Sequence, residues 1–120
     1  MKIALQASPW NRVDIFNDAG FEVVQEPCST EDELIDLLRD ADGAEVGIWP
    51  LVNRRVLESC PKLKVVSRMG VGVDSIDLDA ATELGILACN VPGVNTAEVA
   101  DHAMAMLLSL TRHILSLIHI

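Results

Sequence analysis

The chain has 120 residues, half of them hydrophobic, which is enough for one compact domain with a single core. Its 18 acidic and 9 basic residues give a net charge of -9, and a surface of this sign repels the phosphates of nucleic acids and anionic membranes. The composition therefore argues against a nucleic-acid or membrane partner and favours a small neutral or locally captured ligand.

The N-terminal residues do not form a signal peptide, because the apolar start is interrupted at Gln6. The most apolar stretch, residues 103–110, is far shorter than the roughly 20 residues of a membrane span. The three cysteines are widely spaced and odd in number, which is typical of reduced, mostly buried thiols and not of a disulfide framework or a zinc site. They are Cys28, Cys60 and Cys89. We therefore expect a cytoplasmic protein.

Short β-type runs alternate with helical segments along the first 90 residues. This alternation predicts an α/β fold, with a parallel sheet that carries helices on both faces. The predicted strands are residues 2–6, 22–25, 45–49, 64–67 and 86–89. Five βα repeats are then nearly complete by residue 90.

Capping residues mark the starts of the predicted helices. Thr30 and Glu33 have the spacing of a capping box, ahead of a helix that should end near Asp42. Asn53 is a good N-cap for a shorter helix, and Asp77 is one for a third. These helices would connect the second to fifth strands.

A long helix is predicted after the turn at Pro92 and Gly93. Asn95 is expected to cap it, and Glu98 to lie against its positive end. Its middle, residues 99–110, is apolar nearly all round. In a soluble protein this pattern predicts a helix buried between two bodies.

The loop after the fourth predicted strand is the best candidate for a site. Gly70 and Gly72 alternate with other residues there, so the backbone can turn sharply and expose consecutive N–H groups around Val71. Such a concavity suits a carboxylate, and ligands of open parallel sheets bind beyond the carboxyl ends of strands. A tight connection without a ligand is the alternative, and the residues alone leave both open.

This loop does not match a dinucleotide fingerprint. Gly70 and Gly72 correspond to the first two glycines of G-x-G-x-x-G, but the third position is Ser75. Residues 88–91, where a ribose-binding acid is wanted, are neutral. No coenzyme-binding residue is therefore predicted.

No metal site or catalytic group is predicted either. Asp74, Asp77 and Asp79 lack the closing glutamate of a calcium loop, so capping and solvation account for them. His102 has no other histidine or cysteine at ligand spacing, and we expect a structural histidine whose hydrogen bonds are satisfied. No Ser/His/Asp or Cys/His arrangement can be assembled.

A longer motif contains the glycine loop. Residues 62–77 read KLKVVSRMGVGVDSID, and they resemble the glycine loop of the D-isomer-specific 2-hydroxyacid dehydrogenases, most closely the phosphoglycerate dehydrogenase-like branch. Residues 80–86 and 90–102 are similar to the next helix, strand and linker helix of that family. The resemblance is strong from Leu63 onward, weaker before it, and stops near Arg112.

The resemblance implies a domain organisation. Residues 1–94 would form a flavodoxin-like substrate-binding domain, residues 95–115 an interdomain linker helix, and residues 116–120 a truncated or foreign tail. The family's Rossmann coenzyme domain, its catalytic arginine, glutamate and histidine would be missing. The chain would then be the N-terminal part of an NAD(P)-dependent oxidoreductase that acts on the CH–OH group of D-2-hydroxy acids.

The resemblance also implies site residues. The backbone N–H groups of Val71 and Gly72, with Gly70 shaping the turn, would hold the carboxylate of a small 2-hydroxy or 2-keto acid. Asn95 would lie near the substrate and the nicotinamide. Some phosphoglycerate dehydrogenases place an arginine for the substrate phosphate where this chain has residues 49–51, Trp-Pro-Leu, which puts a phosphorylated substrate in doubt.

The complete protein is expected to use NAD or NADP and to form a homodimer. The chain by itself is expected to bind no coenzyme, to be inactive, and to self-associate through its apolar helix. The alternative is a stand-alone, non-catalytic α/β module that binds a small ligand. A receiver domain is excluded, because residues 7–9 and 49–50 lack its acidic positions, and a flavodoxin is excluded by the absence of a phosphate loop at residues 8–10.

Overall fold

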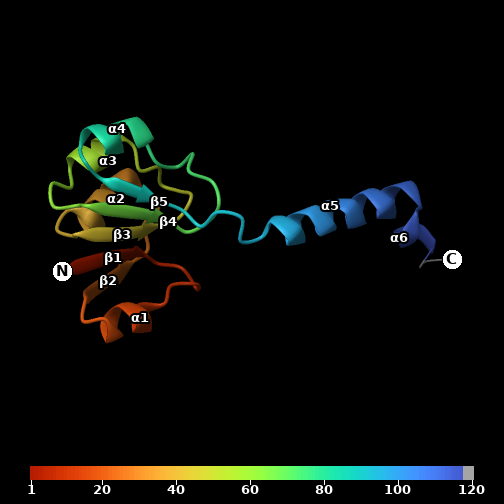
Figure 1. Cartoon of the computed structure of the whole chain (residues 1–120), viewed down its shortest axis with the longest axis horizontal. Helices are drawn as coiled ribbons and strands as arrows, with labels where there is room; N and C mark the ends of the chain where they lie inside the picture. The colour runs from red at the N-terminus through yellow and green to blue at the C-terminus, as the bar shows by residue number, and fades with distance from the viewer. Residues whose placement is uncertain (118–120) are drawn as a thin grey trace.

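A five-stranded parallel sheet organises the fold, with the strand order β2-β1-β3-β4-β5 (Figure 1). The structure, a computed structural model, describes residues 1–117. The strands are β1 (Lys2–Gln6), β2 (Glu22–Glu26), β3 (Gly43–Val46), β4 (Val65–Arg68) and β5 (Leu87–Cys89). This is the doubly wound order of flavodoxin-like folds, so the predicted fold class is confirmed.

Helices lie on both faces of the sheet, but they cover the two faces unequally. They are α1 (Val13–Asp18), α2 (Glu31–Leu38), α3 (Arg54–Glu58), α4 (Leu78–Glu83), α5 (Thr96–Thr111) and α6 (Ile114–Leu117). The buried side chains of α2, α3 and α4 share one core cluster on one face. On the opposite face α1 lies against β2, with Phe16 beside Ile3 of β1. Helix α1 was not predicted from the sequence.

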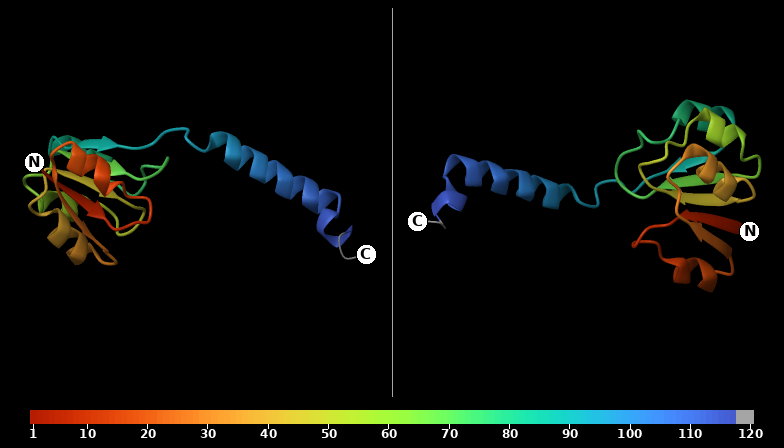
Figure 2. Two further views of the ribbon diagram at one scale, coloured as in Figure 1. Left: turned by 90° about the horizontal axis from the view of Figure 1, so that it is seen from below. Right: turned by 180° about the vertical axis from the view of Figure 1, so that it is seen from behind.

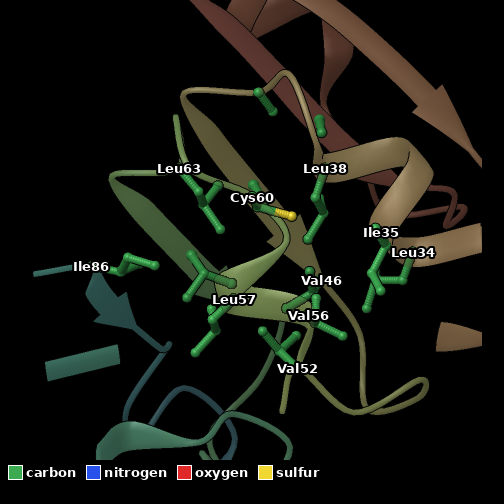
Figure 3. Close-up of a cluster of buried hydrophobic side chains, with 14 of the residues drawn as sticks. Leu34, Ile35, Leu38, Val46, Val52, Val56, Leu57, Cys60, Leu63 and Ile86 are labelled. Atoms are coloured by element: carbon green, nitrogen blue, oxygen red, sulfur yellow. The ribbon is translucent and has the colours of Figure 1, made fainter. Parts of the chain in front are cut away.

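The main core lies between the sheet and helices α2 and α3 (Figure 3). Leu34 and Leu38 of α2 and Val56 of α3 are completely buried there, together with Val46 of β3. Each such side chain contributes about 1.5–3 kcal/mol when it leaves water. This core fixes the position of the strands whose carboxyl ends carry the candidate site.

Three predicted caps are present. The Thr30 hydroxyl accepts the Glu33 backbone N–H at 3.3 Å, and the Glu33 carboxylate accepts the Thr30 N–H at 3.2 Å. The side chains of Asn53 and Asp77 each accept the backbone N–H three residues on, at 3.1 and 2.9 Å. Asn95 begins α5 as predicted, but its side chain caps nothing, because its backbone (φ -126°, ψ 22°) is not in the extended conformation of an N-cap.

Two predicted boundaries were wrong. Strand β3 ends at Val46, not Trp49, because the Gly47 N–H donates to the Gln6 side chain at 2.8 Å and leaves the sheet ladder. Helix α2 ends at Leu38, well before Asp42, whose backbone N–H instead donates to the Lys2 carbonyl at 2.8 Å.

Helix α5 extends away from the sheet, as the views in Figure 1 and Figure 2 agree. The radius of gyration is 18.7 Å, against about 14 Å for a compact chain of this length. Residues 99–110 were predicted to be buried between two bodies. No residue of α5 is buried, so the described residues do not cover this helix. Residues 95–115 contain α5 and the start of α6, and residues 118–120 of the predicted tail lie outside the described residues. None of the helices described is long and apolar enough to cross a membrane.

The three cysteines are free thiols with different environments. Cys60 is buried in the core, and burial raises the pKa of its thiol to about 11. Cys28 and Cys89 are partly exposed, so the prediction of mostly buried thiols was wrong for these two. Both lie at or just beyond the carboxyl end of a strand, where Cys28 packs against the edge of the core.

Candidate functional site

The loop between β4 and α4 turns sharply at the carboxyl edge of the sheet. The Gly70 N–H donates to the Arg68 carbonyl at 2.8 Å, which closes a tight turn directly after the strand. Gly70 has φ +150°, a conformation that only glycine adopts without strain. The turn therefore depends on a glycine at this position.

Neighbouring strands brace this loop from both sides. The Met69 N–H donates to the Val46 carbonyl at 2.9 Å, and the Val91 N–H donates to the Gly70 carbonyl at 2.9 Å. The Asn90 side-chain amide donates to the Val71 carbonyl at 2.7 Å. These hydrogen bonds engage the carbonyls of Gly70 and Val71 and fix the backbone of the loop.

The N–H groups of Val71 and Gly72 differ from these carbonyls, because they have no hydrogen-bond partner in the protein described. Within residues 1–117 neither group donates a hydrogen bond to the protein. Val71 is exposed and Gly72 is half-buried, so these two consecutive donors are available to water or to a ligand. An oxyanion is the ligand that such a pair can hold.

The loop and the start of α5 line a hollow of ≈ 600 Å³ that is open to solvent. Its walls include all four predicted substrate-binding residues, which are Gly70, Val71, Gly72 and Asn95. Val99 of α5 adds an apolar wall. The structure thus brings together residues that are more than 20 positions apart in the sequence.

The Arg68 side chain also lines this hollow, and the sequence analysis did not identify it. Its Nη1 atom lies 2.2 Å from the position that a Cβ would take on Gly70, and 3.9 Å from the corresponding position on Gly72. Its Nε is buried and has no hydrogen-bond partner among the described residues. The one signal in the sequence is a basic residue at the end of a strand, directly before the glycine loop.

Gln6 is a second residue that the sequence analysis missed. Its buried side chain donates to the carbonyls of Cys28 at 3.1 Å and Trp49 at 2.7 Å, and accepts the Gly47 N–H at 2.8 Å. It therefore ties the ends of β2 and β3 to the end of β1. This bracing holds the carboxyl edge of the sheet in one arrangement.

The loop after β3 packs against the glycine loop. The Val52 N–H donates to the Ser75 carbonyl at 2.8 Å, and the Ser75 hydroxyl donates to the Gly47 carbonyl at 3.4 Å. Trp49 is largely exposed, and its indole N–H donates to the Ser29 carbonyl at 3.3 Å. Residues 47–52 thus bring an indole and aliphatic side chains to this edge but no cation.

The acidic and histidine residues do not form a site within residues 1–117. Asp77 caps α4, and no group of three potential metal-binding side chains was found in this part of the chain. His102 is exposed on α5 and has no hydrogen bond to the described residues, so the predicted structural role with satisfied hydrogen bonds was wrong. The helix that carries it packs against no other part of the domain.

Comparisons with known proteins agree on one family. Residues 4–116 match the model of the "D-isomer specific 2-hydroxyacid dehydrogenase, catalytic domain". The D-3-phosphoglycerate dehydrogenase of Methanocaldococcus jannaschii is 44% identical over 85 residues, which are 71% of this chain and 16% of that protein. The chain thus spans less than a fifth of the length of that relative.

Solved structures show the same likeness in three dimensions. The NAD+-bound 3-phosphoglycerate dehydrogenase of Entamoeba histolytica superimposes with a TM-score of 0.78 at 28% identity, over 91% of this chain and 38% of that chain. The NAD-dependent formate dehydrogenase of Staphylococcus aureus, in complex with NAD, gives a TM-score of 0.78 at 32% identity, over 97% of this chain and 40% of that chain.

Proposed function

Because the chain belongs to the D-isomer specific 2-hydroxyacid dehydrogenase family, we propose that it forms the substrate-binding part of an NAD(P)-dependent oxidoreductase. The reaction would interconvert a D-2-hydroxy acid and the 2-keto acid. The bound nicotinamide would exchange the hydride. This chain would contribute the binding and orientation of the substrate carboxylate.

One observation carries this proposal: Val71 and Gly72, whose backbone N–H groups have no acceptor among the described residues, line the same hollow as Asn95. A carboxylate oxygen accepts hydrogen bonds from such a pair without the help of a side chain. Gly70 provides the turn that exposes the pair, and Asn95 would lie beside the reacting end of the substrate. Orientation of this kind lowers the entropic part of an activation barrier.

The glycine loop does not fit the pyrophosphate of a coenzyme. Ser75 occupies the place of the third glycine of a fingerprint; it is buried, and its hydroxyl is bonded to Gly47. We therefore propose that the 120 residues by themselves bind no nicotinamide coenzyme and catalyse no turnover. Titration calorimetry with NADH tests this, and saturable binding in the micromolar range would contradict it.

The division of the chain is also a proposal. Residues 1–94 would be the substrate-binding domain, residues 95–115 the link to a coenzyme domain, and residues 116–120 a tail. The exposure of α5 supports a linking role, because most of its apolar side chains are left exposed by the described residues. We further propose that the complete protein is a homodimer and that this chain self-associates through α5.

A chimeric enzyme tests the proposed activity. Residues 1–112 would replace the matching segment of the Methanocaldococcus jannaschii relative, and circular dichroism and NADH binding would establish that the chimera folds. We expect NAD+ or NADP+ reduction with at least one D-2-hydroxy acid and none with the L isomers. A folded, coenzyme-binding chimera that binds a 2-keto acid but turns over no D-2-hydroxy acid would favour a non-catalytic ligand-binding module.

A further inference from the structure

Helices cover strands β3, β4 and β5 on one face only. Val66 points into the core, so Val65, the preceding residue of β4, points to the opposite face, as does its partner Leu87 in β5. Leu87 is 63% exposed and Val65 is half-buried. On that side of the described chain α1 lies against β2, at the far edge of the sheet from β5 (Figure 1). Parallel sheets almost always have both faces covered, so this uncovered face lacks a layer.

The uncovered face has an apolar row of side chains next to a row that contains an acid. Strand pairing aligns the first row and, two residues further toward the carboxyl ends, the second: Ile3, Gly43, Val65 and Leu87, followed by Glu45, Ser67 and Cys89. Ile3, Phe16, Val65 and Glu45 line a hollow of ≈ 240 Å³ there. The Glu45 carboxylate accepts the Asn11 side-chain amide at 2.8 Å and has no cationic partner within residues 1–117. The face therefore suits an apolar side chain followed by a cation.

Helix α5 presents such a pair at the matching distance. Leu108 and Arg112 are four residues apart, so they lie on one side of the helix, about 6 Å from each other along its axis. The two rows of the uncovered face are about 7 Å apart. Leu108 is 48% exposed, and Arg112 is exposed and makes no ion pair with the described residues. Met104, one turn before Leu108, extends the apolar stripe.

The direction of this match excludes the helix of the same chain. With Leu108 on the apolar row and Arg112 at Glu45, the helix runs from the amino toward the carboxyl ends of the strands. Thr96 would then lie about 18 Å before Leu108, beyond the amino ends. Val91 is bonded to the glycine loop at the carboxyl edge, and residues 92–95 span at most about 14 Å, too little to reach that point. A second copy of the chain has no such restriction.

We propose that the uncovered face of β3, β4 and β5 binds helix α5 of a second copy of this chain, with Leu108 in the hollow and Arg112 paired with Glu45. The exchange is reciprocal, so each copy covers the sheet of the other and a two-fold dimer closes. The inference rests on the self-association through α5 proposed above and adds the surface that receives the helix. Burial of apolar side chains from both surfaces supplies the driving force.

Sedimentation equilibrium of the full 120-residue chain measures the dissociation constant of the dimer. Leu87→Lys should raise that constant at least tenfold, because a charge replaces an apolar contact at the centre of the interface. Leu84→Lys is the matched control, since Leu84 is 44% exposed at the end of α4, on the other side of the sheet. It should leave the constant unchanged, and circular dichroism shows whether each variant folds.

A charge exchange tests the proposed ion pair. Glu45→Arg and Arg112→Glu should each raise the dissociation constant about fivefold, and the double variant should recover most of the loss. General repulsion between acidic chains predicts the opposite for Glu45→Arg, because this change lowers the net negative charge. Single variants that associate as the wild type does would remove Glu45 and Arg112 from the interface and overturn the proposed orientation of the helix.

A mixture of isotope-labelled and unlabelled full chains identifies the surface that receives the helix. Isotope-filtered nuclear Overhauser spectra should show contacts between the methyl groups of Leu87 in one copy and of Leu108 in the other. If the filtered contacts join α5 only to α5, and Leu87→Lys associates as the wild type does, this inference is wrong and self-association through α5 stands. If the wild type stays monomeric, the proposed self-association fails, and this inference fails with it.

Discussion

Arg68 occupies the space that a side chain at residue 70 would need. A Cβ on Gly70 would lie 2.2 Å from Arg68 Nη1, closer than any real contact allows, and Gly70 also has φ +150°. The glycine therefore serves both the turn and the placement of the guanidinium. Any substitution at residue 70 must disturb at least one of them.

Gly70→Ala should lower the free energy of unfolding by about 1–3 kcal/mol, because a non-glycine residue is strained at this φ. It should also distort the turn that leaves the Val71 and Gly72 N–H groups free, and so weaken the binding of pyruvate, the simplest 2-keto acid. Urea denaturation measures the first effect, and a titration with pyruvate followed through the amide signals of Val71 and Gly72 measures the second. Gly20→Ala is the control, since Gly20 has φ +80° with nothing near its Cβ position. Equal destabilisation at both sites, with unchanged pyruvate binding at Gly70→Ala, would contradict this account.

Gly72 and Val71 should respond differently to substitution, because main-chain atoms make the proposed contact. In an active chimera Gly72→Val should raise the Michaelis constant strongly by obstructing the approach of the carboxylate. Val71→Ala should leave that constant nearly unchanged, since it only shortens a partly exposed side chain. Steady-state kinetics with the best D-2-hydroxy acid provides the measurement. Equal tolerance of both changes would refute main-chain recognition.

The sequence predicted most of the features that depend on neighbouring residues, although the cap expected at Asn95 does not form. The caps at Thr30, Asn53 and Asp77 are set by spacings of three residues, and all three form. The strand positions followed from runs of β-type residues, with small errors at their ends. The fold class was predicted from the alternation of β-type and helical segments together with the resemblance to the dehydrogenase family.

What the sequence did not reveal depends on contacts between distant residues. The Gln6 side chain bonds Gly47, which is 41 positions away, and this bond ends β3 earlier than expected. The place of Arg68 beside Gly70 depends on a tight turn that composition does not encode. Helix α1 was missed because its six residues are too few to show a clear helical period.

Gln6→Met should destabilise the domain by about 2–4 kcal/mol. The substitution keeps the size of the side chain but leaves the Gly47 N–H and the Trp49 carbonyl without their partner, at about 1–3 kcal/mol for each buried group. Gln25→Met is the matched control on the adjacent strand, where the amide is exposed. Urea denaturation of both variants is the measurement, and a Gln6→Met variant as stable as Gln25→Met would show that water replaces these bonds.

Asp42 should make the domain sensitive to acid. The backbone N–H of Lys2 donates to its carboxylate at 2.9 Å, and this bond, with the Lys64 ammonium at 3.3 Å, lowers the pKa of Asp42. Because the folded pKa lies below the unfolded value of about 3.9, the stabilisation is present above that value and is lost as the pH falls through the folded pKa. Asp42→Asn should therefore reduce the melting temperature at neutral pH but flatten its decline in acid.

Melting curves between neutral pH and about pH 3 test this prediction. Asp18→Asn is the control, because Asp18 is exposed and makes no ion pair with the described residues. It should run parallel to the wild type across the whole range. An Asp42→Asn variant that keeps the wild-type slope in acid would show that other groups control the acid transition.

Self-association should follow from the apolar surface of α5. Val99, Met104, Met106, Leu107 and Leu110 are each between 54% and 76% exposed, although half-buried or buried positions are usual for such side chains. Apolar patches of this extent on soluble proteins mark interaction surfaces. Burying each side chain offers about 1.5–3 kcal/mol before entropic costs, which is enough to outweigh the mutual repulsion of the acidic chains.

Multi-angle light scattering at increasing concentration should show the chain passing from monomer to larger species. A chain that ends at Asn90 lacks α5 and should remain monomeric at the same concentrations. The double substitution Leu107→Ser and Leu110→Ser in the full chain should shift association to higher concentration without affecting the sheet domain. A hydrophobic dye should bind the full chain and not the shortened one. A full chain that stays monomeric and binds no dye would show that α5 folds back onto its own sheet in solution. Our interpretation of α5 as an element that connects two bodies would then be wrong.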